Sequence, residues 1–221
     1  MAKKASTTTP IETRSVLCEV RAADPASGKH TLVGRPVVFN SRTDLGYFDE
    51  VIAAGSLDKT DLRDVRFLVN HNTDMIPLAR SRNNNENSTL RLMPDEEGLA
   101  IEADLDVENN AEAKALWSAI ERGDISGMSF MFTVPSDGDS WDDPNAEHPT
   151  RTIREIGAIY EVSAVTWPAY QSTSIAARGA EALESASAAL ESARARAKSL
   201  ESDETAKALK LAKAKAIAKL F

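Results

Sequence analysis

The chain changes composition abruptly at Gly179, and this change limits the folds that it can adopt. All ten glycines and all nine prolines lie at or before this residue. The segment 180–221 contains 14 alanines among its 42 residues and neither glycine nor proline. Glycine and proline interrupt regular structure at turns, whereas an alanine-rich segment without them is typical of a helix. The sequence therefore predicts a disordered arm over 1–13, a turn-rich globular domain over 14–178 and a helical tail over 179–221.

Charge divides at the same place. Residues 1–179 hold 18 basic and 28 acidic side chains, a net charge of −10, whereas the tail holds 8 basic and 6 acidic side chains, a net charge of +2. An acidic domain argues against general binding of polyanions, so we expect no specific nucleic-acid partner. Because the tail is basic, a nucleic-acid-binding module built on it is a weaker alternative.

The cysteine count and the distribution of apolar residues exclude further classes of protein. The single cysteine, Cys18, excludes an internal disulfide and a cysteine-based zinc site, and we expect neither a metal nor a cofactor. The chain has no stretch approaching the ~20 apolar residues that cross a bilayer, and its polar start does not resemble a secretory signal. We therefore expect a cytoplasmic protein without a membrane partner.

The globular part favours strands. Leu99, Ile101 and Ala103 alternate with Glu102 and Asp104, the period of two that is typical of a half-buried strand. The turn 94–98 joins this strand to an alternating segment before it. Further strands are expected at 14–22, 31–39, 65–70, 128–134, 151–156 and 159–166. This pattern predicts a mainly β (α+β) fold, a barrel or sandwich with peripheral helices.

Two segments interrupt the strands. A helix is predicted after Asn109, which can cap it with Glu112 three residues on, and before Gly123, which stops it. Its apolar face is Ala113, Leu116, Trp117 and Ile120. The acidic segment 135–149 has four aspartates, but their spacing does not match a calcium-binding EF-hand loop, which favours a solvated insertion.

Ser129 is a candidate nucleophile. If 126–134 includes a strand, Met128 and Phe130 point to the core and Ser129 points to the opposite face. A serine on a rigid strand is preorganised for attack, although the same pattern also fits a serine on the less buried face of an ordinary strand. Ser126 is a rival nucleophile three residues earlier.

A serine nucleophile needs a base, and histidine is the usual one near neutral pH. His71 follows the apolar run 65–70, so it lies where a buried strand ends and can face a cleft. A polar histidine at a strand end explains the same position equally well. The two other histidines, His30 and His148, lie in turn and loop segments and are expected at the surface.

Glu161 is the candidate third residue. It alternates with Ile159 and Ser163 on one face of the predicted strand 159–166, while Tyr160 alternates onto the other face with Val162. A half-buried carboxylate is costly unless it is paired. It can orient a histidine, as in a catalytic triad, or form a structural salt bridge to an arginine.

Three segments in this order, VNHN, ISGMSF and YEVSAVTWPAY, resemble the prohead (capsid maturation) serine proteases of HK97-type tailed bacteriophages. The resemblance spans roughly residues 14–178 and includes the segment YFDEVIAAGSL before the histidine. It implies the fold of herpesvirus assemblins, a β-barrel with surrounding helices. It also implies that His71 is the base, Ser129 the nucleophile and Glu161 the acid.

The chain departs from the family pattern at two places. Met131 stands where the family often has glycine after the Ser-Phe pair, and Ala79-Arg80 stand where it often has Gly-Arg. Larger side chains near the nucleophile would narrow the cleft. These departures bear on the substrate preference rather than on the triad.

The resemblance implies a serine endopeptidase that cleaves the extensions of capsid or scaffold proteins, and itself, within the immature prohead in the host cytoplasm. Self-association is a further expectation. The alternative is a non-catalytic internal scaffold protein of the same fold with a vestigial triad.

The tail carries two apolar stripes, separated by the sequence SDET at 202–205. The first is Leu183, Ala186, Leu190, Ala193, Ala197 and Leu200, and the second is Leu209, Ala212, Ala216 and Leu220. This spacing predicts two helices, the second beginning near Asp203 and Glu204. Alanine-rich helices are marginal alone in water, so we expect the tail to gain stability by docking on scaffold or capsid protein. The alternative is a loosely helical, solvated extension.

Overall fold

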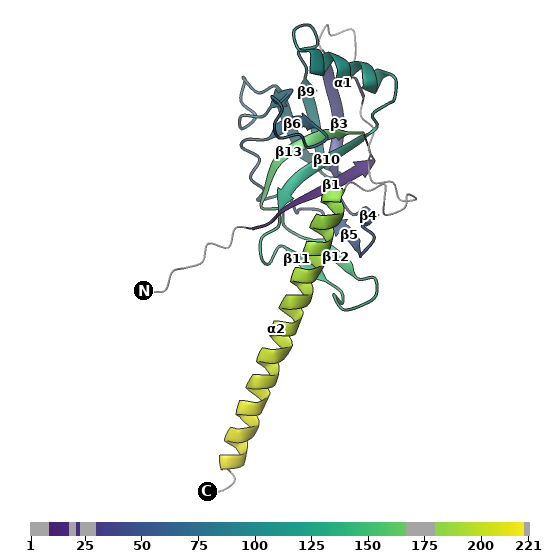
Figure 1. The fold of residues 1–221 in the computed structure, drawn as a ribbon. Coiled ribbons are helices and arrows are strands. Elements are labelled where there is room, and N and C mark those ends of the chain that lie inside the picture. The colour runs from purple at the N-terminus through teal and green to yellow at the C-terminus, as the bar shows by residue number, and fades with distance from the viewer. Residues whose placement is uncertain (1–8, 18–20, 23–29, 167–179, 219–221) are drawn as a thin grey trace.

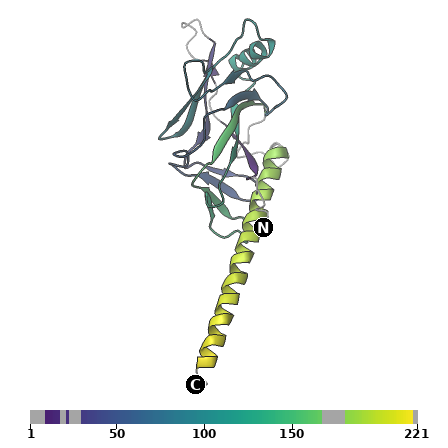
Figure 2. The same ribbon diagram turned by 90° about the vertical axis from the view of Figure 1, so that its left-hand side faces the viewer.

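The computed structural model describes residues 9–17, 21–22, 30–166 and 180–218. A body of β-strands carries a short helix, α1, at one end, and a long helix, α2, projects past the opposite end (Figures 1 and 2). The predicted fold class, mainly β with peripheral helices and a C-terminal helix, is confirmed.

Within the described residues the strands form three sheets. Sheet A has the order β1 (Ile11–Leu17), β10 (Gly127–Thr133), β13 (Ala158–Val165), β6 (Arg66–Val69) and β7 (Ala79–Arg80). Sheet B has the order β2 (Arg21–Ala22), β3 (Thr31–Val38), β9 (Gly98–Asp104) and β8 (Leu90–Asp95). Sheet C has the order β11 (Asp139–Trp141), β12 (Thr150–Ile153), β5 (Asp49–Ile52) and β4 (Arg42–Asp44). The sheets do not close into a barrel in these residues, which corrects that part of the expectation.

The main core joins sheets A and B. Met128, Phe130 and Phe132 of β10 are all fully buried and belong to one apolar cluster with Leu32 of β3 and Ile101 of β9. The alternation along β10 therefore directs the apolar side chains as predicted. Burying each such side chain contributes about 1.5–3 kcal/mol, so this face fixes the orientation of β10.

Helix α1 (Ala111–Glu121) is capped by Asn110 rather than by the expected Asn109. The Asn110 side chain accepts hydrogen bonds from the backbone N–H groups of Glu112 and Ala113, at 2.9 and 3.2 Å. Asn109 instead bonds Asp106 through its backbone and side chain. The predicted apolar face is confirmed, since Ala113, Leu116, Trp117 and Ile120 are the buried residues of the helix.

Helix α2 (Ala180–Ala218) is continuous over 39 residues, so the predicted division into two helices near Asp203 is wrong. No glycine or proline interrupts the segment, and Asp203 and Glu204 lie within the helix on its exposed surface. The first apolar stripe docks on the chain's own body, where Ala186 and Leu190 join a buried cluster with Leu45 and Phe48. Leu200 is 66% exposed, and the docking ends before it. Among the described residues no helix, α2 included, has the length and apolar character of a membrane span.

Two segments differ from the expectation: the N-terminal arm and the acidic segment 135–149. Strand β1 begins at Ile11, inside the segment expected to be a disordered arm; residues 1–8 of that arm lie outside the described residues. The acidic segment 135–149, expected to be a solvated insertion, contains β11, and its Asp139 side chain is only 5% exposed. In both segments a buried carboxylate is paired with arginine, which explains why they are ordered.

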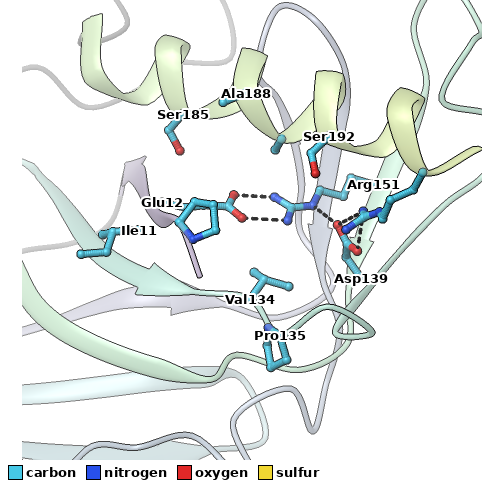
Figure 3. Close-up of a pocket in the computed structure, with 12 residues that line it drawn as sticks. Ile11, Glu12, Val134, Pro135, Asp139, Arg151, Ser185, Ala188 and Ser192 are labelled. Atoms are coloured by element: carbon cyan, nitrogen blue, oxygen red, sulfur yellow. Dashed lines mark hydrogen bonds and ion pairs between the residues drawn. The ribbon is translucent and has the colours of Figure 1, made fainter. Parts of the chain in front are cut away.

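These carboxylates belong to a buried network of charges between sheet A, sheet C and α2. Arg14 of β1 donates to Glu50 of β5 at 2.6 and 2.8 Å and to Glu12 at 2.7 Å. Arg151 of β12 donates to both oxygens of Glu12, at 2.5 and 2.8 Å, and to Asp139 at 2.8 Å (Figure 3). The alternation of opposite charges compensates the cost of removing each from water.

Helix α2 completes this network. Arg196 pairs with Asp139 at 3.1 Å, and the Ser185 hydroxyl accepts hydrogen bonds from the Thr13 backbone N–H and the Arg14 guanidinium. Ser185 and Asp139 lie on opposite sides of the Glu12–Arg151 pair in Figure 3. The start of α2 is thus joined to β1 by polar contacts as well as by apolar packing.

The network sets the ionisation of Glu12. Burial alone would raise the pKa of this carboxyl, but attraction to Arg14, the hydrogen bonds of Arg151 and the charge of Arg151 outweigh it. The pKa of Glu12 in the folded chain is therefore below its ordinary value of 4.5. Such a group stabilises the fold fully above its unfolded pKa, and this stabilisation is lost as the pH falls through the folded pKa.

We predict that Glu12→Gln lowers the free energy of unfolding by about 3 kcal/mol at pH 7, because it leaves buried arginine charge without its partner. Urea denaturation measures this change. The difference from the unmodified chain should shrink as the pH falls below 4.5, where the carboxyl of Glu12 becomes protonated in the unfolded chain, and should become small once the pH is below the lowered pKa of the folded chain. Glu97→Gln is the matched control, because Glu97 pairs with Arg35 while 77% exposed and should cost less than about 1 kcal/mol. Equal losses for the two variants would contradict the role of the network.

We also predict that the two ends of α2 differ in their effect on stability. A chain ending after Arg178 uncovers Phe48 and Leu45, so its free energy of unfolding should fall by about 3–6 kcal/mol. A chain ending after Leu200 keeps the docked stripe and should stay within about 1 kcal/mol of the full chain. Thermal and urea denaturation compare the two. Equal stability of all three chains would show that docking of α2 is not part of the fold.

Candidate active site

His71 follows β6 in an unusual backbone turn. Asn70 and His71 are both left-handed, with φ of 51° and 57°. Asparagine and histidine tolerate this conformation better than most residues, but it is still costly and persists only where the surroundings impose it. The Asn70 side chain is held by Thr166, whose backbone N–H donates to Oδ1 at 2.9 Å and whose hydroxyl accepts from Nδ2 at 3.0 Å. The end of β13 thus fixes the turn that carries His71.

His71 and Glu161 form a hydrogen-bonded pair. The imidazole Nδ1 lies 2.6 Å from Oε1 of Glu161, and the side chains are 11% and 4% exposed. Among the described residues this buried carboxylate therefore pairs with the histidine rather than with an arginine. The other histidines lie elsewhere: His30 stacks edge-on against Trp117, and His148 lies 3.3 Å from Asp49.

Ser163 ties the pair together and was not singled out by the sequence analysis. Its hydroxyl donates to Oε2 of Glu161 at 2.5 Å and accepts a hydrogen bond from the His71 backbone N–H at 3.2 Å. One hydroxyl therefore orients the carboxylate and the turn that carries the imidazole. The available signal in the sequence is the spacing of two residues from Glu161, which puts both side chains on one face of a strand.

A β-bulge in β13 sets which side chains face this site. Met131 of β10 pairs with Glu161, but the next residue, Phe132, pairs with Ile159, so Tyr160 is the extra residue. Tyr160 is 42% exposed, and Ile159 returns to the core. The expectation that Ile159 shares a face with Glu161 is therefore wrong, because a bulge shifts the alternation by one residue.

Ser129 lies on β10, directly opposite Ser163 in the antiparallel register. Its side chain is fully buried, and its hydroxyl donates to the backbone carbonyl of Arg14 at 2.8 Å and accepts a hydrogen bond from the Ser15 hydroxyl at 3.0 Å. Both partners belong to β1, on the side of β10 away from β13. Ser129, Glu161 and His71 thus come from three adjacent elements of sheet A: β10, β13 and the end of β6.

The structure joins two of the three predicted site residues directly. His71 and Glu161 are bonded, while the Ser129 hydroxyl is directed to β1. Nε2 of His71 is buried and has no hydrogen-bond partner among the described residues. The rival Ser126 precedes β10 by one residue and is half-buried.

Three residues that could together bind a metal ion lie apart from the His71–Glu161 pair. Asp44, Asp49 and His148 bring ligand atoms within 4.8 Å of one another at the body surface near β4 and β5. Asp49 is already paired with Arg42 at 2.8 Å and lies 3.3 Å from His148. We therefore interpret Asp44, Asp49 and His148, together with Arg42, as a set of surface ion pairs.

Among solved structures, the chain is similar to the capsid assembly protease gp21 of bacteriophage T4, with a TM-score of 0.41 and 15% identity over 72% of this chain and 97% of that chain. No curated protein matches the chain.

The sequence profile described as Caudovirus prohead serine protease matches residues 17–186. The match covers β6, β10 and β13 completely, and with them His71, Ser129 and Glu161. It extends over most of the chain, and it confirms the resemblance noted in the sequence. The chain belongs to the caudovirus prohead serine protease family.

Proposed function

We propose that this protein is a serine endopeptidase that cleaves extensions of capsid or scaffold proteins, and itself, inside the immature prohead in the host cytoplasm. The observation that carries this proposal is the pair of His71 and Glu161 at 2.6 Å in a member of the prohead protease family, with a buried Nε2 that has no partner in the described part of the chain. Ser129, on the strand next to Glu161, is the nucleophile that we assign.

In the proposed mechanism Glu161 fixes the tautomer of His71. Nδ1–H donates to the carboxylate, so the proton of the neutral ring is on Nδ1 and the lone pair is on Nε2. Nε2 then accepts the Ser129 proton as the serine oxygen attacks the scissile carbonyl. The same nitrogen donates that proton to the leaving amine, and the carboxylate stabilises the imidazolium in between.

The hydrogen bonds of Ser129 add one requirement. Its hydroxyl donates to the carbonyl of Arg14, and a nucleophile must donate to its base instead. We therefore propose that the Ser129 hydroxyl turns from β1 towards Nε2 of His71 before it attacks. Nε2 favours this change, because a buried acceptor without a partner costs about 1–3 kcal/mol.

The alternative is a non-catalytic internal scaffold protein with a vestigial triad. The burial of Ser129 and the direction of its hydroxyl towards β1 are the observations in its favour. A chain that is folded and assembled into proheads, yet cleaves neither itself nor capsid protein, would support this alternative.

We predict that Ser129→Ala abolishes proteolysis, with a loss in kcat on the order of 10⁶, because it removes the attacking oxygen. Mass spectrometry of the purified protein, alone and with capsid protein, measures the cleavage products. Ser126→Ala is the matched control and should retain most of the activity, since Ser126 lies outside β10. If Ser126→Ala were the inactive variant, the assignment of the nucleophile would be wrong by three residues.

We predict that Glu161→Gln lowers kcat by about 10⁴, because an amide can favour the wrong tautomer of His71. Ser163→Ala should lower kcat by about 10- to 100-fold, the effect of one hydrogen bond to a charged group. Peptide hydrolysis assays measure both, and Ser163→Thr should recover part of the loss because it restores a hydroxyl.

Ser81→Ala is the control for Ser163→Ala. Ser81 is also fully buried and hydrogen-bonded, to Asn84, just after β7. We expect similar losses of stability in the two variants but a loss of kcat only for Ser163→Ala. Equal kcat in both would remove Ser163 from the site.

A further inference from the structure

A cavity of about 430 Å³ opens between helix α1 and the turn that carries His71. Asn70 and Asn72, the residues on either side of His71, line one wall, and Leu116 and Ala119 of α1 line the other. Ile125, which leads into β10, is also part of the lining. The cavity therefore borders the turn that carries the proposed base and the segment that leads into the strand of the proposed nucleophile.

The lining is mostly apolar. Besides Leu116, Ala119 and Ile125 it includes Val69 and Met75, which pack against the main core but remain partly exposed. Ala115 and Ala119 lie one helical turn apart on one face of α1, and their small side chains leave space in the cavity for a side chain of a ligand. Such a surface gains free energy when an apolar side chain covers it.

One charged group lies in the lining, the exposed Glu112 near the start of α1. No basic side chain contributes to the lining as the structure describes it. An acidic side chain would therefore be repelled by Glu112 without a partner to offset the repulsion, whereas an aliphatic side chain can pack against the apolar residues that make up most of the lining. The cavity thus favours an aliphatic side chain.

The distance to the nucleophile suits a peptide substrate. Ile125 precedes Ser129 by four residues, at most about 13 Å along an extended chain. A peptide bound in extended form advances by the same ~3.3 Å for each residue. A side chain about two to four residues from the scissile bond can therefore reach the cavity.

We propose that this cavity is a substrate subsite that accepts an aliphatic side chain two to four residues from the cleaved bond. The proposal rests on the proposed function, since it assumes that a peptide crosses Ser129 and His71. It assigns part of the cleavage specificity to α1 and to Asn70, Asn72 and Met75, which are not members of the triad.

The first test measures cleavage with a library of octapeptides that place leucine or glycine at each position in turn. In the unmodified chain, glycine in place of the leucine that fills the subsite should lower kcat/KM by about 10- to 30-fold, mainly through KM. Ala115→Phe fills the cavity from an exposed helix position and should reduce this leucine preference to less than about 3-fold. Lys114→Phe, an exposed neighbour outside the lining, is the matched control and should keep the preference. An unchanged preference in Ala115→Phe would overturn the proposal.

The second test does not depend on catalysis. In the Ser129→Ala chain, the methyl resonance of Met75, identified with Met75→Leu, is followed by NMR as the leucine peptides or an all-glycine peptide are added. We expect a saturable shift with the leucine peptide that fills the subsite and none with glycine. Absence of cleavage by the unmodified chain together with a Met75 shift would contradict the proposed function and leave the subsite supported. Cleavage that depends on Ser129 without any Met75 shift would overturn the subsite alone.

Discussion

The antiparallel pairing of β10 with β13 is the constraint on which the site depends. It sets Ser129 opposite Ser163, and the parallel pairing of β13 with β6 puts the turn at His71 near the end of β13, from which the imidazole reaches Glu161. A shift of one residue would turn Phe130 to the site face and Ser129 into the core. The burial of Met128 and Phe130 excludes that shift, so the apolar core holds the polar site in register.

The local alternation of residues predicted this part of the fold well. The core face of β10 and the apolar face of α1 follow from periods of 2 and 3.6 residues, and both are observed. The need of Glu161 for a partner also followed from its apolar neighbours. The identity of that partner did not, because only the three-dimensional path of the chain brings residue 71 to residue 161.

The predictions that were wrong concern features that depend on contacts between residues distant in the sequence. The bulge at Tyr160 leaves no mark in the alternation of the sequence, so Ile159 was assigned to the wrong face. Asp139 reads as one acid among several in a polar loop, yet Arg151 and Arg196 bury it. The start of β1 was missed for the same reason, since the charge of Glu12 is compensated not only by Arg14 of the same strand but also by Arg151 of β12, in another sheet.

The long helix has a mechanical consequence. At ~1.5 Å per residue, α2 spans nearly 60 Å, and the part beyond its docked stripe extends by roughly 30 Å. Docking supplies the costly first turns of the helix, so each later residue needs only the small free energy of propagation. The result is a semi-rigid rod fixed at one end to the body. If the far end of α2 is held on a surface, the body can move only within roughly 30 Å of the attachment point, the length of the free part of the helix. This confines the body to a small volume and keeps its local concentration there high.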